Sequence, residues 1–113
     1  LGLGDFRAIP NGIGSVEHRM DLMYQGVVTG QITLERWVEL TSTTPARMFG
    51  MYGKKGVIAP GADADITILD PDREWVFERR DTASKSQNNP FYGWTLKGKP
   101  TATSVAGKIV WRE

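Results

Sequence analysis

Residues 54–70 read KKGVIAPGADADITILD, and this stretch decides how the chain folds. It predicts two short strands around a tight turn. The β-branched Val57 and Ile58 open the first strand, and Pro60-Gly61 breaks it, because proline fixes φ and glycine accepts φ > 0. The run 66–69 has high β propensity and forms the second strand. The turn-forming Asp70-Pro71-Asp72 then ends that strand.

Three helices are predicted upstream of this stretch. Ser15 is placed to cap the first, which carries an apolar stripe made of Val16, Met20, Met23 and Val27. Thr33 caps the second, in which the residues at helical spacing are Leu34, Trp37, Val38 and Thr41. The third begins at Thr44-Pro45, a capping residue followed by proline at the first helical position.

Strands are predicted downstream of the same stretch. Residues 74–77 form a third strand, and a long polar connection follows over residues 79–100. A connection of this length is usually pinned or functional, and we expect Phe91, Tyr92 and Trp94 to pin it. The chain ends in a hairpin over residues 101–111 that turns at Ala106-Gly107. The order is therefore helices first and strands second, with a boundary near Gly53.

Composition narrows the class of protein. The chain has 113 residues, of which 40% are hydrophobic and 24% charged, so it is globular and too short for a complete (β/α)8 barrel, which needs roughly 250 residues. Its 14 basic and 13 acidic side chains nearly cancel, so neither a nucleic acid nor a membrane is expected as a partner.

Other functions are excluded by missing residue types. The chain has no cysteine, which excludes disulfides and thiolate metal sites and fits a reducing cytoplasm. No apolar run approaches the roughly 18 residues that span a bilayer. Because the chain starts with Leu1 rather than methionine, we expect a piece of something longer or a processed product.

Several motifs, in order along residues 5–72, carry a resemblance. The pattern Gly56-x-Ile58-x-x-Gly61-x-Asp63-Ala64-Asp65 resembles the segment that follows the barrel in metal-dependent amidohydrolases. Ile9-Pro10-Asn11-Gly12, Ser15-Val16-Glu17-His18-Arg19-Met20 and Thr41-Ser42-Thr43-x-Pro45-Ala46 narrow it to cyclic amidohydrolases of the dihydropyrimidinase and D-hydantoinase type. Residues 84–94 resemble dihydroorotases and allantoinases instead, since dihydropyrimidinases usually carry histidine there and this chain has none.

The resemblance implies an α/β fragment of two parts. Residues 1–53 would supply the last helices of a (β/α)8 metal-dependent hydrolase barrel. Residues 54–113 would supply strands of a small composite β-sandwich, with the long loop 79–100. The whole enzyme would open the ring amide of hydantoins or dihydropyrimidines and would form a homo-oligomer.

The resemblance also implies where the chemistry lies. Enzymes of this family use two divalent metal ions, commonly zinc, to bridge a hydroxide and polarise the scissile carbonyl. In the family order every ligand of these metals precedes Leu1. We therefore expect no catalytic residue and no metal ligand in this chain, and no activity from the chain alone.

Asn11 is the one site residue that the resemblance carries over, as a substrate-binding residue. An asparagine offers donors and acceptors that match an –NH–CO– edge. Pro-Asn-Gly also makes a β-turn without any ligand, so from the residues alone both interpretations stay open.

Two other groups are given structural roles. We expect His18 to be a surface or interface residue, flanked by solvated or paired Glu17 and Arg19. Asp63 and Asp65 could be a metal pair, but after a Pro-Gly turn we expect them to bond backbone amides.

Two alternatives to the hydrolase remain. The chain could be a non-catalytic, dihydropyrimidinase-like oligomerisation module, or a piece of a dihydroorotase or allantoinase. A free-standing binding domain is a weaker third interpretation, because the ordered matches over residues 5–72 would then be coincidental.

Overall fold

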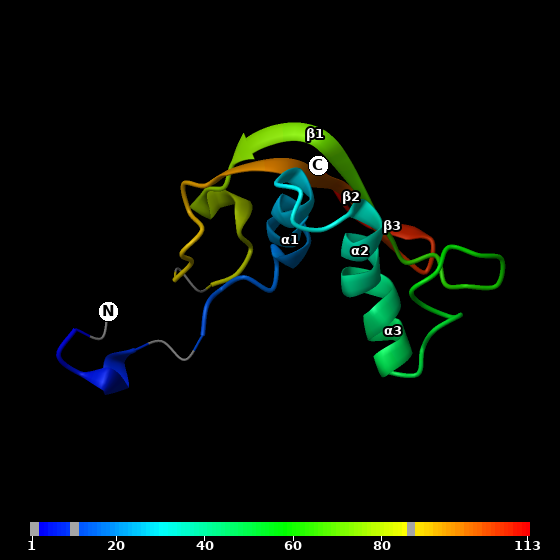
Figure 1. Ribbon diagram of the computed structural model, residues 1–113, viewed down its shortest axis with the longest axis horizontal. Helices are drawn as coiled ribbons and strands as arrows, with labels where there is room; N and C mark the ends of the chain where they lie inside the picture. The colour runs from blue at the N-terminus through cyan, green and yellow to red at the C-terminus, as the bar shows by residue number, and fades with distance from the viewer. Residues whose placement is uncertain (1–2, 10–11, 86–87) are drawn as a thin grey trace.

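The computed structural model describes residues 3–9, 12–85 and 88–113 (Figure 1). In this part of the chain the elements are η1 (Phe6–Ala8), α1 (Arg19–Val28), α2 (Leu34–Val38), η2 (Glu39–Thr43), α3 (Thr44–Met48), β1 (Ile66–Val76), η3 (Arg79–Asp81), β2 (Thr95–Val105) and β3 (Lys108–Arg112). The predicted order of helices before strands is confirmed. None of the described helices is long and apolar enough to pass through a bilayer.

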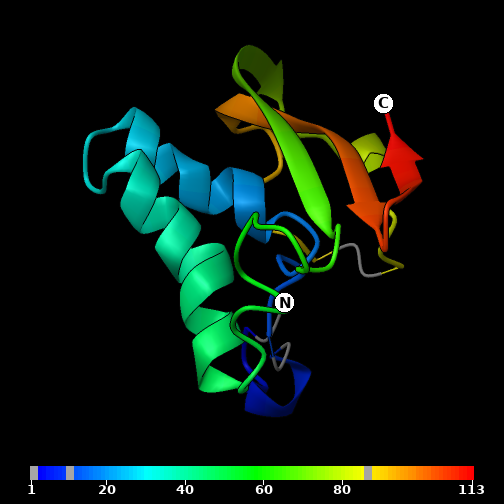
Figure 2. The same cartoon turned by 90° about the vertical axis from the view of Figure 1, so that its right-hand side faces the viewer.

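The strands form one antiparallel sheet in the order β1-β2-β3. The helices lie together on one side of this sheet (Figure 2). The α/β class predicted from the sequence is therefore confirmed at this level. The fully buried side chains belong to the sheet region: Phe77 directly follows β1 and is 0% exposed, and Leu96 on β2 is 1% exposed.

Helix α1 packs against β2 through an unexpected face. The predicted apolar stripe is wrong at its start, since Val16 precedes the helix and is 85% exposed. The residues of α1 that are buried are Asp21 and Tyr24. The ring of Tyr24 fills the space beside Gly98, where an added Cβ would lie 2.4 Å from Tyr24 Cδ1. Glycine at 98 thus permits the close approach of α1 to β2.

The predicted second and third helices are one continuous helix, so the predicted break at Thr44-Pro45 is wrong. Thr33 caps it as expected, its hydroxyl accepting from Arg36 N at 3.1 Å. The junction is a π-helical turn, η2, in which the amide of Thr44 donates to the carbonyl of Glu39. In a regular α-helix the ring of Pro45 would clash with the carbonyl four residues earlier, and the wider turn accommodates it.

The first strand predicted in the stretch 54–70 is wrong. Ile58 is 87% exposed, and the ordered pairing here is a single bridge between Tyr52 and Lys55. The stretch closes instead as a loop, with the amide of Asp63 donating to Lys54 O at 2.9 Å. A loop closed on itself leaves no extended backbone at 57–58 for a neighbouring strand to pair with.

The strands predicted at 66–69 and 74–77 are present, but as the single strand β1. Asp70-Pro71-Asp72 does not end the strand, because the irregularity in pairing between Asp70 and Glu74 absorbs the turn-forming residues as a bulge. The connection is also shorter than predicted. β2 begins at Thr95, so residues 95–100 are strand rather than loop.

The predicted terminal hairpin is confirmed. β2 and β3 pair in antiparallel register around Ala106-Gly107. Both turn residues have positive φ, 49° and 78°, as a two-residue type I′ hairpin turn requires. The division of the chain into parts at residue 53 stays a prediction.

Candidate functional site

Asn11 lies outside the described residues, as does Pro10, so the predicted substrate contact stays a prediction. The chain is described again from Gly12, and the segment 12–18 leads from the Pro10-Asn11-Gly12 motif into α1. This segment lies beside the connection that follows β1. The candidate site is therefore built from the residues on which these two segments meet.

Two side chains join the segments. The carboxylate of Glu17 accepts hydrogen bonds from the backbone amides of Ala83 at 2.7 Å and Ser84 at 3.1 Å. The side-chain amide of Asn89 donates to Gly14 O at 2.6 Å, and Gly14 N donates to Asn88 O at 3.2 Å. The segment 12–18 is thus bonded to the connection on both sides of residues 86–87.

His18 is buried where the segment 12–18 contacts the connection after β1. Its side chain is bonded through Nδ1 to Asp21 Oδ2 at 3.0 Å, and the two residues are 7% and 3% exposed. The imidazole ring lies 4.2 Å from the ring of Phe77, centroid to centroid. Of the predicted surface or interface role for His18, the surface role is therefore wrong, and no local pattern would have revealed the burial, since Phe77 is distant in sequence.

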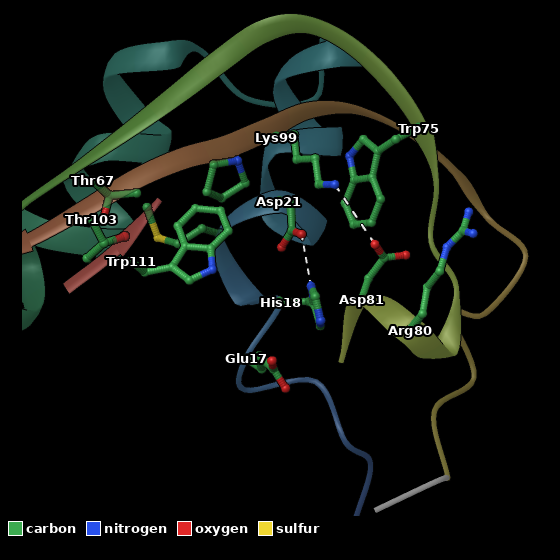
Figure 3. Close-up of a pocket in the computed structure, with 12 residues that line it drawn as sticks. Glu17, His18, Asp21, Thr67, Trp75, Arg80, Asp81, Lys99, Thr103 and Trp111 are labelled. Carbon is green, nitrogen blue, oxygen red and sulfur yellow. Dashed lines mark hydrogen bonds and ion pairs between the residues drawn. The ribbon is translucent and has the colours of Figure 1, made fainter. Parts of the chain in front are cut away.

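A cavity of about 450 Å³ opens beside this pair (Figure 3). Carboxylates of Glu17, Asp21 and Asp81 line it, from the segment before α1, from α1 and from η3. Arg80 also lines it, as does the ammonium group of Lys99 on β2. This ammonium group lies 3.9 Å from Asp81 Oδ1, 3.0 Å from Glu113 Oε1 and 4.7 Å from the ring centre of Trp75. The cavity thus has charges of both signs beside an apolar and aromatic part of its lining.

These charges act on the pKa of His18. Burial, the largest single influence, lowers the pKa, while the hydrogen bond that His18 donates to Asp21 and the negative charges of Asp21, Glu17 and Asp81 raise it. The raising influences together exceed the effect of burial, so the pKa lies above its ordinary value of 6.5. The imidazole is therefore held toward its charged form.

The carboxylates of Asp63 and Asp65 both contact the ammonium group of Lys55. Lys55 Nζ lies 2.9 Å from Asp63 Oδ2 and also donates to Asp65. Asp65 accepts a further bond from Ala106 N at 2.8 Å. Backbone bonding was predicted, and for Asp65 it is confirmed, although the amide belongs to the hairpin turn rather than to a nearby residue. The pair ties the loop 54–65 to the turn between β2 and β3.

The described donor side chains are not grouped as a metal site requires. Within residues 3–9, 12–85 and 88–113, no group of three or more His, Cys, Asp or Glu side chains is arranged to hold a metal ion. The described residues do not fit the binuclear centre that the resemblance implies. His18 is bonded to a carboxylate through Nδ1, but its Nε2 is buried without a hydrogen-bond partner in the described structure. The geometry of His18 therefore suits a structural role better than a catalytic one.

Comparison with known families places the chain. The sequence profile of the amidohydrolase family matches residues 7–110. This chain belongs to the amidohydrolase family. The match spans the segment 12–18, β1, the connection and β2, so the two segments that meet at the candidate site lie within one family match.

Curated amidohydrolases with similar sequences carry closely related names. A D-hydantoinase of Streptomyces coelicolor is 46% identical over 110 residues, covering 97% of this chain and 24% of its own length. A D-phenylhydantoinase of Escherichia coli is 42% identical over 111 residues, again covering 97% of this chain and 24% of its own length. The chain spans about a quarter of these relatives. The hydantoinase resemblance predicted from the sequence is confirmed.

Solved amidohydrolase structures share the fold. One D-hydantoinase superposes with a TM-score of 0.91 at 44% identity, covering 96% of this chain and 24% of its own. An L-hydantoinase (dihydropyrimidinase) from Arthrobacter aurescens superposes with a TM-score of 0.88 at 34% identity, with the same coverage of 96% and 24%. Because D- and L-hydantoinases both match, the fold of this stretch does not separate the two.

Proposed function

We propose that this chain forms the C-terminal part of a metal-dependent cyclic amidohydrolase that opens the ring amide of hydantoins or dihydropyrimidines. The observation that carries this proposal is the extent of the likeness. It reaches 46% identity over 97% of the chain in one D-hydantoinase, and a TM-score of 0.91 in a solved one. A likeness that covers helices, connection and sheet together is expected if the whole stretch has the same role in this chain as in those enzymes.

The two parts of the chain have different roles in this proposal. Residues 1–53 complete the (β/α)8 barrel with its last helices, and residues 54–113 supply strands of the β-sandwich. The arrangement of the elements supports this division, since every described α-helix ends by Met48 and every strand begins at or after Ile66. Amphipathic helices need a sheet to cover, and a barrel would provide one.

Asn11 binds the cyclic amide in this proposal. Its side chain and backbone can pair with both the N–H and the carbonyl of a ring amide. The two divalent metals, commonly zinc in this family, would be held by residues outside this chain, because the described donors do not fit them. The chain therefore contributes substrate binding and support, and by itself it is inactive.

A domain-exchange experiment tests the proposal. Residues 1–113 replace the matching quarter of a characterised D-hydantoinase, and ring opening of hydantoin and dihydrouracil is measured. We expect turnover within about tenfold of the parent, which corresponds to about 1.4 kcal/mol in the barrier. The parent truncated before the exchanged stretch is the control and should be inactive. A folded, metal-loaded chimera without turnover would overturn the proposal.

The isolated chain gives a second measurement. With zinc or manganese added, it should open hydantoin, dihydrouracil and dihydroorotate no faster than the metal alone. Turnover above that level would mean that residues of this chain build a catalytic site of their own.

A second candidate is a non-catalytic oligomerisation module. The observation that favours it is the exposed apolar surface of the sheet, where Ile68 is 58%, Ile109 65% and Val110 60% exposed. The two candidates predict different partners. A module would associate through the sheet but leave the chimera inactive, whereas the hydrolase requires the chimera to turn over.

A further inference from the structure

The connection between β1 and β2 holds the residues that immediately follow the Pro10-Asn11-Gly12 motif. Gly14 is bonded at both its amide and its carbonyl, to Asn88 and Asn89. Glu17, three residues later, is bonded to the amides of Ala83 and Ser84. Contacts at two points fix both the position and the direction of a short segment.

The Asn89 side chain is suited to this role in both of its halves. Its Oδ1 accepts from Phe91 N at 3.0 Å, which fixes the orientation of the amide group. Its Nδ2 then faces Gly14 O at 2.6 Å. An aspartate could make the first of these bonds but has no donor for the second.

The connection is itself anchored to the sheet. Phe77, at the start of the connection, is fully buried, and its ring packs against His18 at 4.2 Å and Tyr92 at 5.4 Å. Phe77 N donates to Trp94 O at 2.9 Å, and Gly93 N donates to Phe77 O at 2.8 Å. The two ends of the connection are thereby closed on each other, so its bonds to Gly14 and Glu17 start from a fixed base.

We propose that Asn89 and Glu17 are positioning residues for substrate binding. They hold the segment 12–17 against residues 82–85 and 88–91 of the connection, and so they anchor the chain next to the predicted substrate-binding Asn11. This inference rests on the proposed function. Gly14 lies three residues along the chain from Asn11, a reach of at most about 11 Å, so any substrate contact of Asn11 is made within a short length of chain from an anchored residue.

The kinetics of the D-hydantoinase chimera that carries residues 1–113 test this inference, and this chimera is the wild type for the variants below. Asn89→Asp removes the donor to Gly14 O while it keeps the acceptor for Phe91 N. We expect the KM for hydantoin or dihydrouracil to rise about tenfold, with kcat changed less than about twofold, because binding is lost equally from substrate and transition state. Glu17→Ala should raise KM in the same way. Glu17→Gln, which keeps one carbonyl acceptor, should recover part of the loss.

Lys85→Ala is the matched control, because it changes an exposed side chain in the same connection, between the two anchors. Its KM should equal that of the wild type. Thermal midpoints are measured for every variant. If the Asn89 and Glu17 variants melt earlier but keep the wild-type KM, the residues are merely structural and the inference is overturned.

Failure of the proposed function is separate from failure of this inference. A wild-type protein that opens no cyclic amide overturns the proposed function and the inference together. An active wild type whose Asn89→Asp variant has an unchanged KM overturns the positioning role alone.

Discussion

The buried pair His18–Asp21 makes the stability of the folded protein depend on pH. The pKa of His18 is raised in the folded state because the hydrogen bond to Asp21 and the charges of Asp21, Glu17 and Asp81 together outweigh the lowering effect of burial. A raised pKa contributes stability that is complete below the ordinary value of 6.5 and is lost as the pH rises through the higher folded value. We therefore expect the free energy of unfolding, measured by urea denaturation, to fall as the pH rises from 6.5 through the folded pKa of His18.

Two variants check this pH dependence. In His18→Gln the fall in the free energy of unfolding between about pH 6 and pH 8 should be smaller than in the wild type, because no imidazole titrates. In Asp21→Asn the hydrogen bond loses its charge and only Glu17 and Asp81 still oppose the effect of burial on the pKa of His18, so the fall should likewise shrink. An equal fall in the wild type and in His18→Gln would show that other groups cause it.

At the scale of single residues, the sequence predicted local hydrogen bonding better than it predicted which side chains are buried. Thr33 does cap its helix, since capping depends on short-range geometry. Asp65 does bond a backbone amide, but that of Ala106 in the distant hairpin turn rather than one nearby. His18 was expected at the surface because the aromatic ring that covers it, Phe77, arrives only with β1. Neither Asn89 nor Glu17 stood out, because the atoms that they bind are backbone atoms, which the sequence does not distinguish.

At the scale of elements, the contact between the continuous helix and the loop 54–65 depends on Gly56. An added Cβ at this position would lie 2.5 Å from Ala46 Cβ and 3.1 Å from Ser42 O, and φ is +76°. Gly56→Ala must therefore separate the loop from the helix. We expect it to lower the free energy of unfolding by on the order of 3 kcal/mol, from overpacking and backbone strain together.

Gly53→Ala is the control for this prediction. Its φ of +93° is as unfavourable for alanine, but a Cβ there would meet nothing within 4 Å. It should cost about 1–2 kcal/mol, from backbone strain alone. Equal losses for the two variants, measured by urea unfolding, would show that the contact of Gly56 with Ala46 does not limit stability.

The elements themselves were predicted where the signal is local. The hairpin at the end of the chain follows from Ala106-Gly107 between two β-rich runs, and it is present. Residues 43–45 and 70–72 were interpreted as ends of elements, and both are crossed, by a π-helical turn and by a bulge. Such irregularities are tolerated when packing on either side outweighs the local cost, which a sequence pattern cannot weigh.

At the scale of the whole molecule, we expect self-association through the sheet. β1 and β3 are both edge strands, and the apolar side chains of β3 are exposed, Ile109 at 65% and Val110 at 60%. Exposed edges with apolar side chains favour pairing with another chain. Size-exclusion chromatography with light scattering should give a mass above that of one chain.

A charge placed on this surface tests the route of association. Ile109→Lys should shift the protein toward the mass of a single chain. Leu34→Lys is the matched control, because Leu34 is 50% exposed but lies on a helix away from β3. A clean monomer of the wild type at high concentration would contradict the prediction, as would equal effects of the two variants.

The docking of α1 on β2 has a consequence for how the protein is made. The side chain of Gln25 bonds both the amide and the carbonyl of Lys97, and these residues are 72 positions apart. At 5–20 residues per second, roughly 4–14 s pass on the ribosome between them. During this time the ring of Tyr24 has no strand to cover it. A pause in translation between these two positions would therefore prolong the interval in which the nascent chain is most open to chaperones and to aggregation.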